Sequence, residues 1–486
     1  MPYKPVISKS KYLVGLQCPK LLWISYNAKN MLPKISDSTQ YIFDQGNEVG
    51  DLAKKLYPNG KEIAWGMGFK RMIEKSKELL KERIPIYEAS FLSNQGFSRI
   101  DILNPVNKDE WDLIEVKSST KVDDTNLHDV SFQKYCCRGL KIRKTFLMHI
   151  NKEYKRKGEL DINKLFKLED ITKEVKKLSP FVKERLNGML NIIQKSKPDI
   201  GIGPFCNKPY ICGLKDSCWD FLPEDNVFEL NRISSKGFDL LGEGITAIKD
   251  IPLGFKLSDK QNIQKDSTIN KKTHIDKAAI KSFFKNLKYP IHYFDFETIN
   301  SAIPLFEDSS PYQQIPFQFS LHIQEKNNKT EHHEFLSEGK QDPRPELLKK
   351  MKDSFKDSGS IIVYYKSFEI GRLKEMAEDF PKYKKYIEKL LTRFVDLYVP
   401  FSSFHYYNPS QKGSASLKKT MPALTGKGYE NLGINEGNLA AREYMRITYT
   451  EVDKKEANAV RNNLLEYCGQ DTEGMIWMMD ELRKMV

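Results

Sequence analysis

Three cysteines lie close together in the segment 206–218, which reads CNKPYICGLKDSC. Cys206, Cys212 and Cys218 are evenly spaced, and the proline, glycine and asparagine around them indicate a loop. Thiols grouped in this way are typical of ligands of one metal centre. A centre with four thiolate ligands needs one more donor from elsewhere in the chain. The segment therefore predicts that two distant parts of the sequence meet in the fold.

The composition limits the class of protein. The 486 residues suffice for two or three domains, and 40% hydrophobic content is ample for buried cores. Residues 1–10 lack the apolar run of a signal peptide, and no segment approaches the roughly 20 apolar residues that span a bilayer. We therefore expect a cytoplasmic protein without a membrane partner, whose cysteines serve metal binding or catalysis. The net charge of +13 favours nucleic acid as a partner, although a lysine-rich proteome would give the same excess.

Strand-like and helical segments alternate along the chain and predict an α/β fold in three regions. An N-terminal domain spans 1–227 and includes a lysine-rich, helical stretch at 160–196. A helical connector spans 228–284, and a second strand-rich domain, 285–486, ends in a long helix. Residues 236–252 of the connector are compatible with an ordinary linker or with a helix-hairpin element that binds phosphate through backbone N–H groups.

Two acids and a lysine form the first candidate site. Asp101 ends one strand-like segment, and Glu115 and Lys117 follow across a predicted hairpin, on one face because side chains alternate along a strand. Two acids on neighbouring strands can hold Mg²⁺, which polarises a phosphate and lowers the pKa of a water. The lysine would orient that water or offset the developing charge. An ordinary hairpin with surface charges is the alternative.

This D…ExK arrangement resembles the motif of the PD-(D/E)XK nucleases. Gln133 and Tyr135, on the next predicted helix, resemble the Gln/Tyr-bearing helix of the RecB-family nucleases. Glu48, on an earlier helix, lies where that family carries a His or Glu metal ligand, although a solvated helical acid is an alternative. The resemblance implies a restriction-endonuclease-like domain in which Asp101, Glu115, the lysine and Gln133 are catalytic.

Cys18, in the helix-like stretch 8–26, precedes this core. One N-terminal cysteine, a nuclease core and three clustered cysteines resemble the iron–sulfur branch of the RecB nucleases, which includes AddB-type enzymes and CRISPR-associated exonucleases. The resemblance implies that Cys18 joins the three clustered cysteines in holding a [4Fe–4S] cluster. A structural Zn²⁺ is the alternative, although the spacing differs from the CxxC of zinc knuckles. The remaining cysteines are expected to be ordinary helix residues: Cys136, Cys137 and Cys468.

A second constellation lies in the C-terminal domain. Asp295 and Glu297 face the same side of an aromatic strand, and Tyr467 and Asp471 share a face of the terminal helix. These residues resemble the Tyr-bearing DEDD pattern of the DnaQ-type exonucleases, which have a ribonuclease H-like fold. The resemblance implies that four acids hold two ions, Mg²⁺ or Mn²⁺, across the scissile phosphate, and that Tyr467 orients the attacking water.

The remaining acid of this pattern has two candidates. Glu369 has the expected context of a helix after a strand, but the family usually carries Asp there, and Tyr365 stands where Asn is common. Asp396 is the other candidate. Residues 413–424 add serines and lysines that either contact phosphate or belong to a capped surface helix.

The whole chain resembles a bacterial family that fuses an iron–sulfur RecB-like nuclease to a DnaQ-like exonuclease. The resemblance implies a Mg²⁺- or Mn²⁺-dependent phosphodiester hydrolase that acts on DNA in processing, repair or defence against foreign DNA. An RNA exonuclease is one alternative. A non-catalytic nucleic-acid-binding or redox-sensing scaffold is another, because Glu369 departs from the family pattern.

Overall fold

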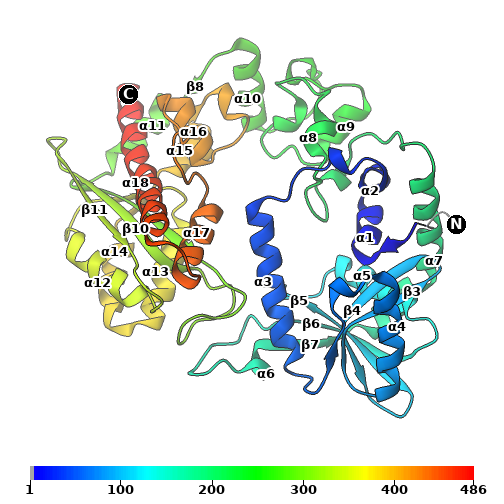
Figure 1. Ribbon diagram of the computed structural model, residues 1–486. Coiled ribbons are helices and arrows are strands. Elements are labelled where there is room, and N and C mark those ends of the chain that lie inside the picture. The colour runs from blue at the N-terminus through cyan, green and yellow to red at the C-terminus, as the bar shows by residue number, and fades with distance from the viewer. Residues whose placement is uncertain (1–4) are drawn as a thin grey trace. The chain divides into compact units, whose positions relative to one another are not determined.

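The computed structural model describes residues 5–486, without the side chains of residues 37 and 38. It is a mixed α/β protein that divides into two compact units (Figure 1). The first unit contains the described residues through Phe221 together with Ser301–Tyr312, and the second contains Leu222–Asn300 and Gln313–Val486. The region 228–284, predicted as a separate connector, is part of the second unit. Among the described residues, no helix has the length and apolar character needed to cross a membrane.

A mixed sheet forms the centre of the first unit. Its strand order within the described residues is β2-β3-β4-β5-β6-β7, and β1 pairs with β4. The strands are β1 (Ile7–Ser8), β2 (Lys61–Glu62), β3 (Ile86–Ser93), β4 (Gly96–Pro105), β5 (Glu110–Lys117), β6 (Lys141–Ile150) and β7 (Phe166–Asp170). β3, β4 and β5 are antiparallel, whereas β6 runs parallel to β5. A parallel pair requires a crossover, which α5 (Asp124–Cys136) supplies.

Helices cover both faces of this sheet. Those of the first unit, besides α5, are α1 (Lys9–Gln17), α2 (Pro19–Asn27), α3 (Asp37–Lys54), α4 (Phe69–Leu79), α6 (Ile162–Leu165), α7 (Thr172–Gln194) and α8 (Lys215–Trp219). α3 packs against the face that includes Ile114, whereas α4, α5 and α7 pack against the face that includes Leu113. Because side chains alternate along β5, Glu115 and Lys117 share the face of Leu113, on the side of α5.

A break between two helices places Cys18 at a corner. The Ser8 hydroxyl caps α1 by accepting a hydrogen bond from the backbone N–H of Lys11. The extended backbone of Cys18 (φ −154°, ψ 119°) ends α1, and Pro19 begins α2 with its ring at the first helical position. The stretch expected to be helix-like is therefore two helices, and the lysine-rich stretch expected to be helical also contains the strand β7.

The second unit is built on another mixed sheet. Its strand order within the described residues is β11-β10-β9-β12-β13. The strands are β9 (Ile291–Ile299), β10 (Ile315–Gln324), β11 (Thr330–Leu336), β12 (Ile361–Val363) and β13 (Phe394–Asp396), and a separate pair joins β8 (His274–Ile275) to β14 (Tyr406–Tyr407). β9, β10 and β11 are antiparallel, and β12 runs parallel to β9 and to β13.

The faces of β9 are chemically different. Phe294 and Phe296 belong to a buried core on the side of α12, α13 and α14. Asp295 and Glu297 alternate to the other face, against which α18 packs along β9 and β10 (Figure 1). The helices of this unit are α9 (Lys236–Gly242), α10 (Asp259–Asn270), α11 (Lys277–Lys285), α12 (Arg344–Ser354), α13 (Ser367–Asp379), α14 (Lys384–Leu391), α15 (Tyr398–Ser402), α16 (Leu417–Thr425), α17 (Gly437–Tyr449) and α18 (Lys454–Lys484).

Candidate active sites

Glu115 lies at the centre of a hydrogen-bonded network in the first unit. Its side chain is fully buried, and its Oε1 accepts hydrogen bonds from Lys117 Nζ at 2.5 Å and Lys9 Nζ at 2.8 Å. Its Oε2 accepts a hydrogen bond from Gln133 Nε2 at 2.6 Å. Asp101, on β4, lies 3.7 Å from Lys9 Nζ through its Oδ1. The structure thus brings together four of the residues that the sequence analysis singled out.

Two further members of this network were not foreseen from the sequence. Asp129 is buried on α5, where its carboxylate accepts hydrogen bonds from Lys117 Nζ and Gln133 Nε2, both at 2.9 Å. The signal for Asp129 was its position one helical turn before Gln133. Lys9 begins α1 and reaches the acids from a distant part of the chain. Burial lowers the pKa of both lysines, but the surrounding acids outweigh this effect and raise the pKa of each above its ordinary value.

Two other residues from the sequence analysis lie outside this network. Glu48 is exposed on α3 and does not line the cavity at the site, whereas Asp51 of the same helix does. Tyr135 accepts a hydrogen bond from Asn94 Nδ2 at 2.8 Å, and its ring packs against a hydrophobic cluster of α1, α2 and α7. Tyr135 therefore has a packing role in this arrangement.

A cavity of about 760 Å³ opens over the network. Asp101, Glu115 and Lys117 line it together with exposed aromatic side chains. Phe43, Trp65 and Tyr210 are 50%, 69% and 63% exposed, respectively. The guanidinium carbon of Arg99 lies 4.9 Å from the centre of the Trp65 ring. The cavity is thus lined by charged side chains and by exposed aromatic side chains.

The four cysteines predicted to form one centre lie together in the first unit. Cys18, Cys206 and Cys212 are buried, and Cys218 is half-buried. Burial raises the pKa of Cys18 and Cys212, and the neighbouring thiols raise both further. Each of the four sulfur atoms therefore lies within electrostatic reach of others in the group.

Gln17 ties the two cysteine-bearing segments to each other. Its Nε2 donates hydrogen bonds to the carbonyl oxygens of Phe205 at 2.9 Å and Tyr210 at 2.7 Å. These hydrogen bonds hold the segment that carries Cys18 beside the segment 206–218.

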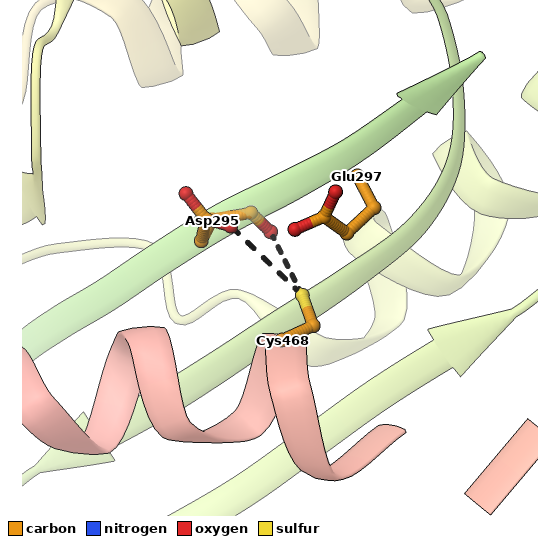
Figure 2. Close-up of side chains that lie close together, drawn as sticks. All are labelled: Asp295, Glu297 and Cys468. Atoms are coloured by element: carbon orange, nitrogen blue, oxygen red, sulfur yellow. Dashed lines mark hydrogen bonds between the residues drawn. The ribbon is translucent and has the colours of Figure 1, made fainter. Parts of the chain in front are cut away.

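Acids from different elements also converge in the second unit. Asp295 and Glu297 point from β9 toward Cys468 of α18 (Figure 2), and one ligand atom from each of the three residues lies within 4.8 Å of the others. Burial, followed by the charge of Asp471, raises the pKa of Asp295 and of Glu297 well above the ordinary value. Cys468 was expected to be an ordinary helix residue. It lies on a helix, as expected, but its position beside these two acids was not predicted.

Asp471 and two tyrosines complete this face of the site. Asp471 is buried on α18, and its Oδ1 accepts a hydrogen bond from the hydroxyl of Tyr429. Burial raises the pKa of Asp471 to about 6, although Tyr429 and Lys418 lower it in part. The pKa of Tyr467 is raised by burial and then by Asp471, Glu297 and Asp295, which places its ring beside the acids. The sequence analysis did not single out Tyr429.

Glu369, on α13, lies within electrostatic reach of Asp295. Its side chain is 2% exposed, and its Oε2 has no hydrogen-bond partner among the described residues. Burial, together with the charge of Asp396, raises the pKa of Glu369 to about 8. The charge of Glu369 in turn contributes to the raised pKa of Asp295.

Asp396, the other candidate, has its carboxylate occupied by backbone groups. Its Oδ1 accepts hydrogen bonds from the N–H groups of Tyr365 and Tyr398, both at 3.0 Å, and its Oδ2 accepts one from Lys366 at 3.1 Å. These bonds hold the turns that begin α13 and α15. The arrangement favours Glu369 over Asp396 as the remaining acid of the group.

Lys418 supplies a positive charge beside the acids. It lies on α16, in the segment whose lysines were considered as phosphate contacts, and its Nζ is 5.5 Å from the centre of the Tyr467 ring. Its charge lowers the pKa of Asp471 and opposes the rise at Glu297. A cavity of about 480 Å³ adjoins the site and is lined by Glu297, Lys418 and Asn438 among others.

Comparisons with known proteins match parts of the chain. Residues 292–416 match a family model described as a domain of unknown function, DUF2779. The chain is 32% identical over 226 residues to Uncharacterized protein MG366 of Mycoplasma genitalium, a match that covers 41% of this chain and 33% of the relative. It is 28% identical over 244 residues to Uncharacterized protein UU173 of Ureaplasma parvum, covering 45% and 34%. The matches thus span about a third of these curated relatives.

Proposed function

We propose that this protein is a metal-dependent nuclease that hydrolyses phosphodiester bonds at a site in each unit. The observation that carries the proposal is the group of acids in the second unit. Asp295, Glu297, Glu369 and Asp471 come from β9, α13 and α18, and they concentrate negative charge in a largely buried place. Such a group is stable as carboxylates only with cations beside it.

The fold of the second unit supports this proposal. Three antiparallel strands followed by two parallel ones, with Asp295 and Glu297 on the central strand, are compatible with the ribonuclease H-like fold implied by the sequence resemblance. In the first unit, Glu115 accepts hydrogen bonds from Lys117 and Gln133 within the β5–α5–β6 crossover, which is compatible with the restriction-endonuclease-like domain implied by the sequence resemblance. We assign a nuclease site to each unit on these grounds.

In the second unit, Asp295, Glu297, Glu369 and Asp471 would hold Mg²⁺ or Mn²⁺. A bound ion supplies polarisation of the phosphodiester and a water of lowered pKa. Tyr429 keeps the Asp471 carboxylate oriented through its hydrogen bond. The acids would give up their protons when a cation binds and would then hold that cation, whereas the other residues would direct substrate and water.

Tyr467 and Lys418 would act on the substrate itself in this site. The hydroxyl of Tyr467 would orient the attacking water, because its ring lies beside Asp295 and Asp471. Lys418 would offset the charge of the scissile phosphate, because it is the cation that lines the cavity next to Glu297. Both residues would contribute most when negative charge builds up during attack.

In the first unit, Asp101 and Glu115 would hold the metal ion. Lys117 is fixed by Glu115 and Asp129, so its ammonium group is held at the floor of the cavity and would stabilise the charge that develops on the phosphate. Gln133 bridges the same acids and keeps Glu115 oriented. The network therefore positions the catalytic lysine before substrate arrives.

We also propose that the four grouped cysteines hold a [4Fe–4S] cluster. The electrostatic influence of these thiols on one another supports a shared centre, and the resemblance to iron–sulfur nucleases favours a cluster over a zinc ion. Protein purified without oxygen should be brown, and Cys18→Ser should bleach it and destabilise the first unit. Colourless protein with stoichiometric zinc would contradict the assignment.

The substrate we favour is DNA with an unpaired strand. The net charge of +13 supports a polyanionic substrate, and the exposed aromatic side chains of Phe43, Trp65 and Tyr210 beside the first site would stack on unpaired bases. RNA has the same stacking faces, so it is tested in parallel with DNA.

The deciding experiment measures cleavage by protein purified without oxygen. Labelled single-stranded DNA, duplex DNA and RNA are incubated with Mg²⁺ or Mn²⁺. We expect Glu115→Gln to abolish one activity and the double variant Asp295→Asn with Glu297→Gln to abolish another, stepwise trimming of ends. Matched controls are Glu110→Gln, on the same strand as Glu115, and Asp480→Asn, on α18.

The outcomes separate the alternatives. Each active-site variant should retain the activity of the other unit, and both controls should retain both activities. Wild-type protein that binds these nucleic acids without cutting any of them would contradict the nuclease proposal and favour a binding scaffold. Cleavage of RNA alone would assign the protein as a ribonuclease.

A further inference from the structure

A thiol lies among the acids of the second unit. The ligand atoms of Asp295, Glu297 and Cys468 all lie within 4.8 Å of one another (Figure 2). The sulfur of Cys468 is 4.0 Å from Oδ2 and 4.0 Å from the main-chain oxygen of Asp295. Cys468 is fully buried and lies on α18, and the two acids lie on β9. The packing of α18 against β9 therefore brings three potential metal ligands together, two carboxylates and one thiol.

A second observation also indicates a cation at this point. Glu369, from α13, is 2% exposed, and its Oε2 has no hydrogen-bond partner in the part of the chain that the structure describes. Its charge acts on Asp295. A buried carboxylate oxygen without a donor is costly unless a cation or a proton compensates it. Glu369 thus adds, independently of the thiol, a buried carboxylate oxygen that lacks a partner among the described residues and whose charge reaches Asp295.

We propose that this site binds a thiophilic divalent cation of the zinc group, with Cys468, Asp295 and Glu297 as its ligands. Zinc and cadmium accept thiolate together with carboxylate, whereas Mg²⁺ requires oxygen ligands. When the ion binds, the thiol of Cys468 releases its proton to solvent, and the sulfur donates an electron pair to the metal.

The consequence for activity rests on the proposed function. A zinc-group ion on these ligands occupies two of the acids that Mg²⁺ or Mn²⁺ requires. Zn²⁺ therefore competes with those ions and inhibits trimming by the second unit. The site in the first unit has carboxylate ligands and a lysine but no thiol beside Glu115 among its described neighbours, so it lacks this preference.

The test titrates the full-length protein with Cd²⁺ alone and follows the ultraviolet charge-transfer band of cadmium thiolate. Cys468→Ala is compared with wild type and with Cys137→Ala, which removes an equally buried thiol from a hydrophobic cluster of the first unit. Wild type and Cys137→Ala should bind one more Cd²⁺ through thiolate than Cys468→Ala. Identical titrations for all three proteins would overturn the proposal.

A second variant keeps every cysteine, so its result does not depend on the folding of Cys468→Ala. Glu297→Gln should weaken this Cd²⁺ step by more than about tenfold, because even an outer partner of a metal ligand contributes that much to affinity. Unchanged affinity in Glu297→Gln would overturn the ligand assignment.

The trimming assay distinguishes this proposal from the nuclease proposal. Trimming with Mg²⁺ in a protein that lacks the Cd²⁺ step would overturn the thiophilic site and leave the exonuclease intact. A Cd²⁺ step in a protein that never trims would support the metal site and contradict the exonuclease.

Discussion

The two candidate sites differ in how negative charge is balanced. In the first unit, the buried carboxylates of Glu115 and Asp129 accept hydrogen bonds from Lys9 and Lys117. In the second unit, Asp295 is beside three other acids that raise its pKa. The chain itself thus supplies hydrogen-bonded cations to the first site. In the second site Lys418 only partly offsets the acids, which therefore depend on cations or protons from solution. This difference yields predictions whose expected effects range from about 3 kcal/mol to about 1.5 kcal/mol.

The largest effect should come from removing a cation of the first site. Lys117→Met leaves the buried carboxylates of Glu115 and Asp129 with fewer donors, and an uncompensated buried charge costs about 3 kcal/mol. We expect the free energy of unfolding of the first unit to fall by this amount in urea titrations. Lys144→Met removes a lysine that pairs with Asp170 at the surface and should cost less than about 1 kcal/mol.

A double variant tests the explanation for Lys117. Adding Asp129→Asn to Lys117→Met removes one uncompensated charge, so part of the lost stability should return. If the double variant is as unstable as the sum of the single variants, loss of packing rather than of charge balance explains the effect.

The next effect should be stabilisation of the second unit by a divalent ion. Mn²⁺ at about 100 times its dissociation constant should raise the free energy of unfolding by about 2.7 kcal/mol, because the ion binds only the folded acids. Calorimetry of wild type with and without Mn²⁺ measures this shift. Asp295→Asn should lose it, whereas the control Asp480→Asn should keep it. An equal shift in Asp295→Asn would place the ion elsewhere.

The pH dependence of stability should also differ between the units. The pKa of Glu369 is about 8 in the folded protein, against an ordinary value of 4.5. The folded state therefore binds this proton more tightly than the unfolded state, so the carboxyl reduces stability progressively as pH rises from 4.5 to about 8. Without metal, Glu369→Gln should reduce the fall in unfolding free energy across this window by roughly 2 kcal/mol or more.

Glu375→Gln is the matched control for this measurement. Glu375 lies on the same helix, but it is partly exposed and pairs with Arg372. The variant should follow the wild-type pH profile. If Glu369→Gln also follows it, the Glu369 carboxyl is protonated or compensated in both states, and the contrast between the two sites disappears.

Local periodicity accounts for what the sequence could predict about these sites. Alternation along β5 and β9 places Glu115 with Lys117 and Asp295 with Glu297, because two residues separated by one share a strand face. The same argument on a helix places Tyr467 with Asp471, although it does not say which strand that helix covers.

Residues that depend on long-range packing were not predicted. Lys9 reaches Glu115 only because α1 folds back onto the sheet, and Tyr429 reaches Asp471 from a loop. Cys468 lies in a helix as expected, but its position beside Asp295 depends on how α18 packs against β9. Spacing within one element carries no information about these contacts.

The smallest effect should come from Tyr429→Phe, which removes one hydrogen bond to Asp471. That hydrogen bond lowers the pKa of Asp471, which burial raises to about 6. Without it the pKa should rise further, and the carboxyl must then lose its proton at higher pH before it binds metal. A lost hydrogen bond to a charged group corresponds to about 1.5 kcal/mol, or about one pKa unit. The pH of half-maximal Mn²⁺ binding should therefore move upward by about that amount.

Tyr406→Phe is the matched control, because it removes a hydroxyl that donates to the carbonyl of Ala423 and should leave the midpoint unchanged. A midpoint that stays fixed in Tyr429→Phe would mean that Asp471 does not limit metal binding, and the dependence of the second site on solution cations would then rest on Asp295, Glu297 and Glu369 alone.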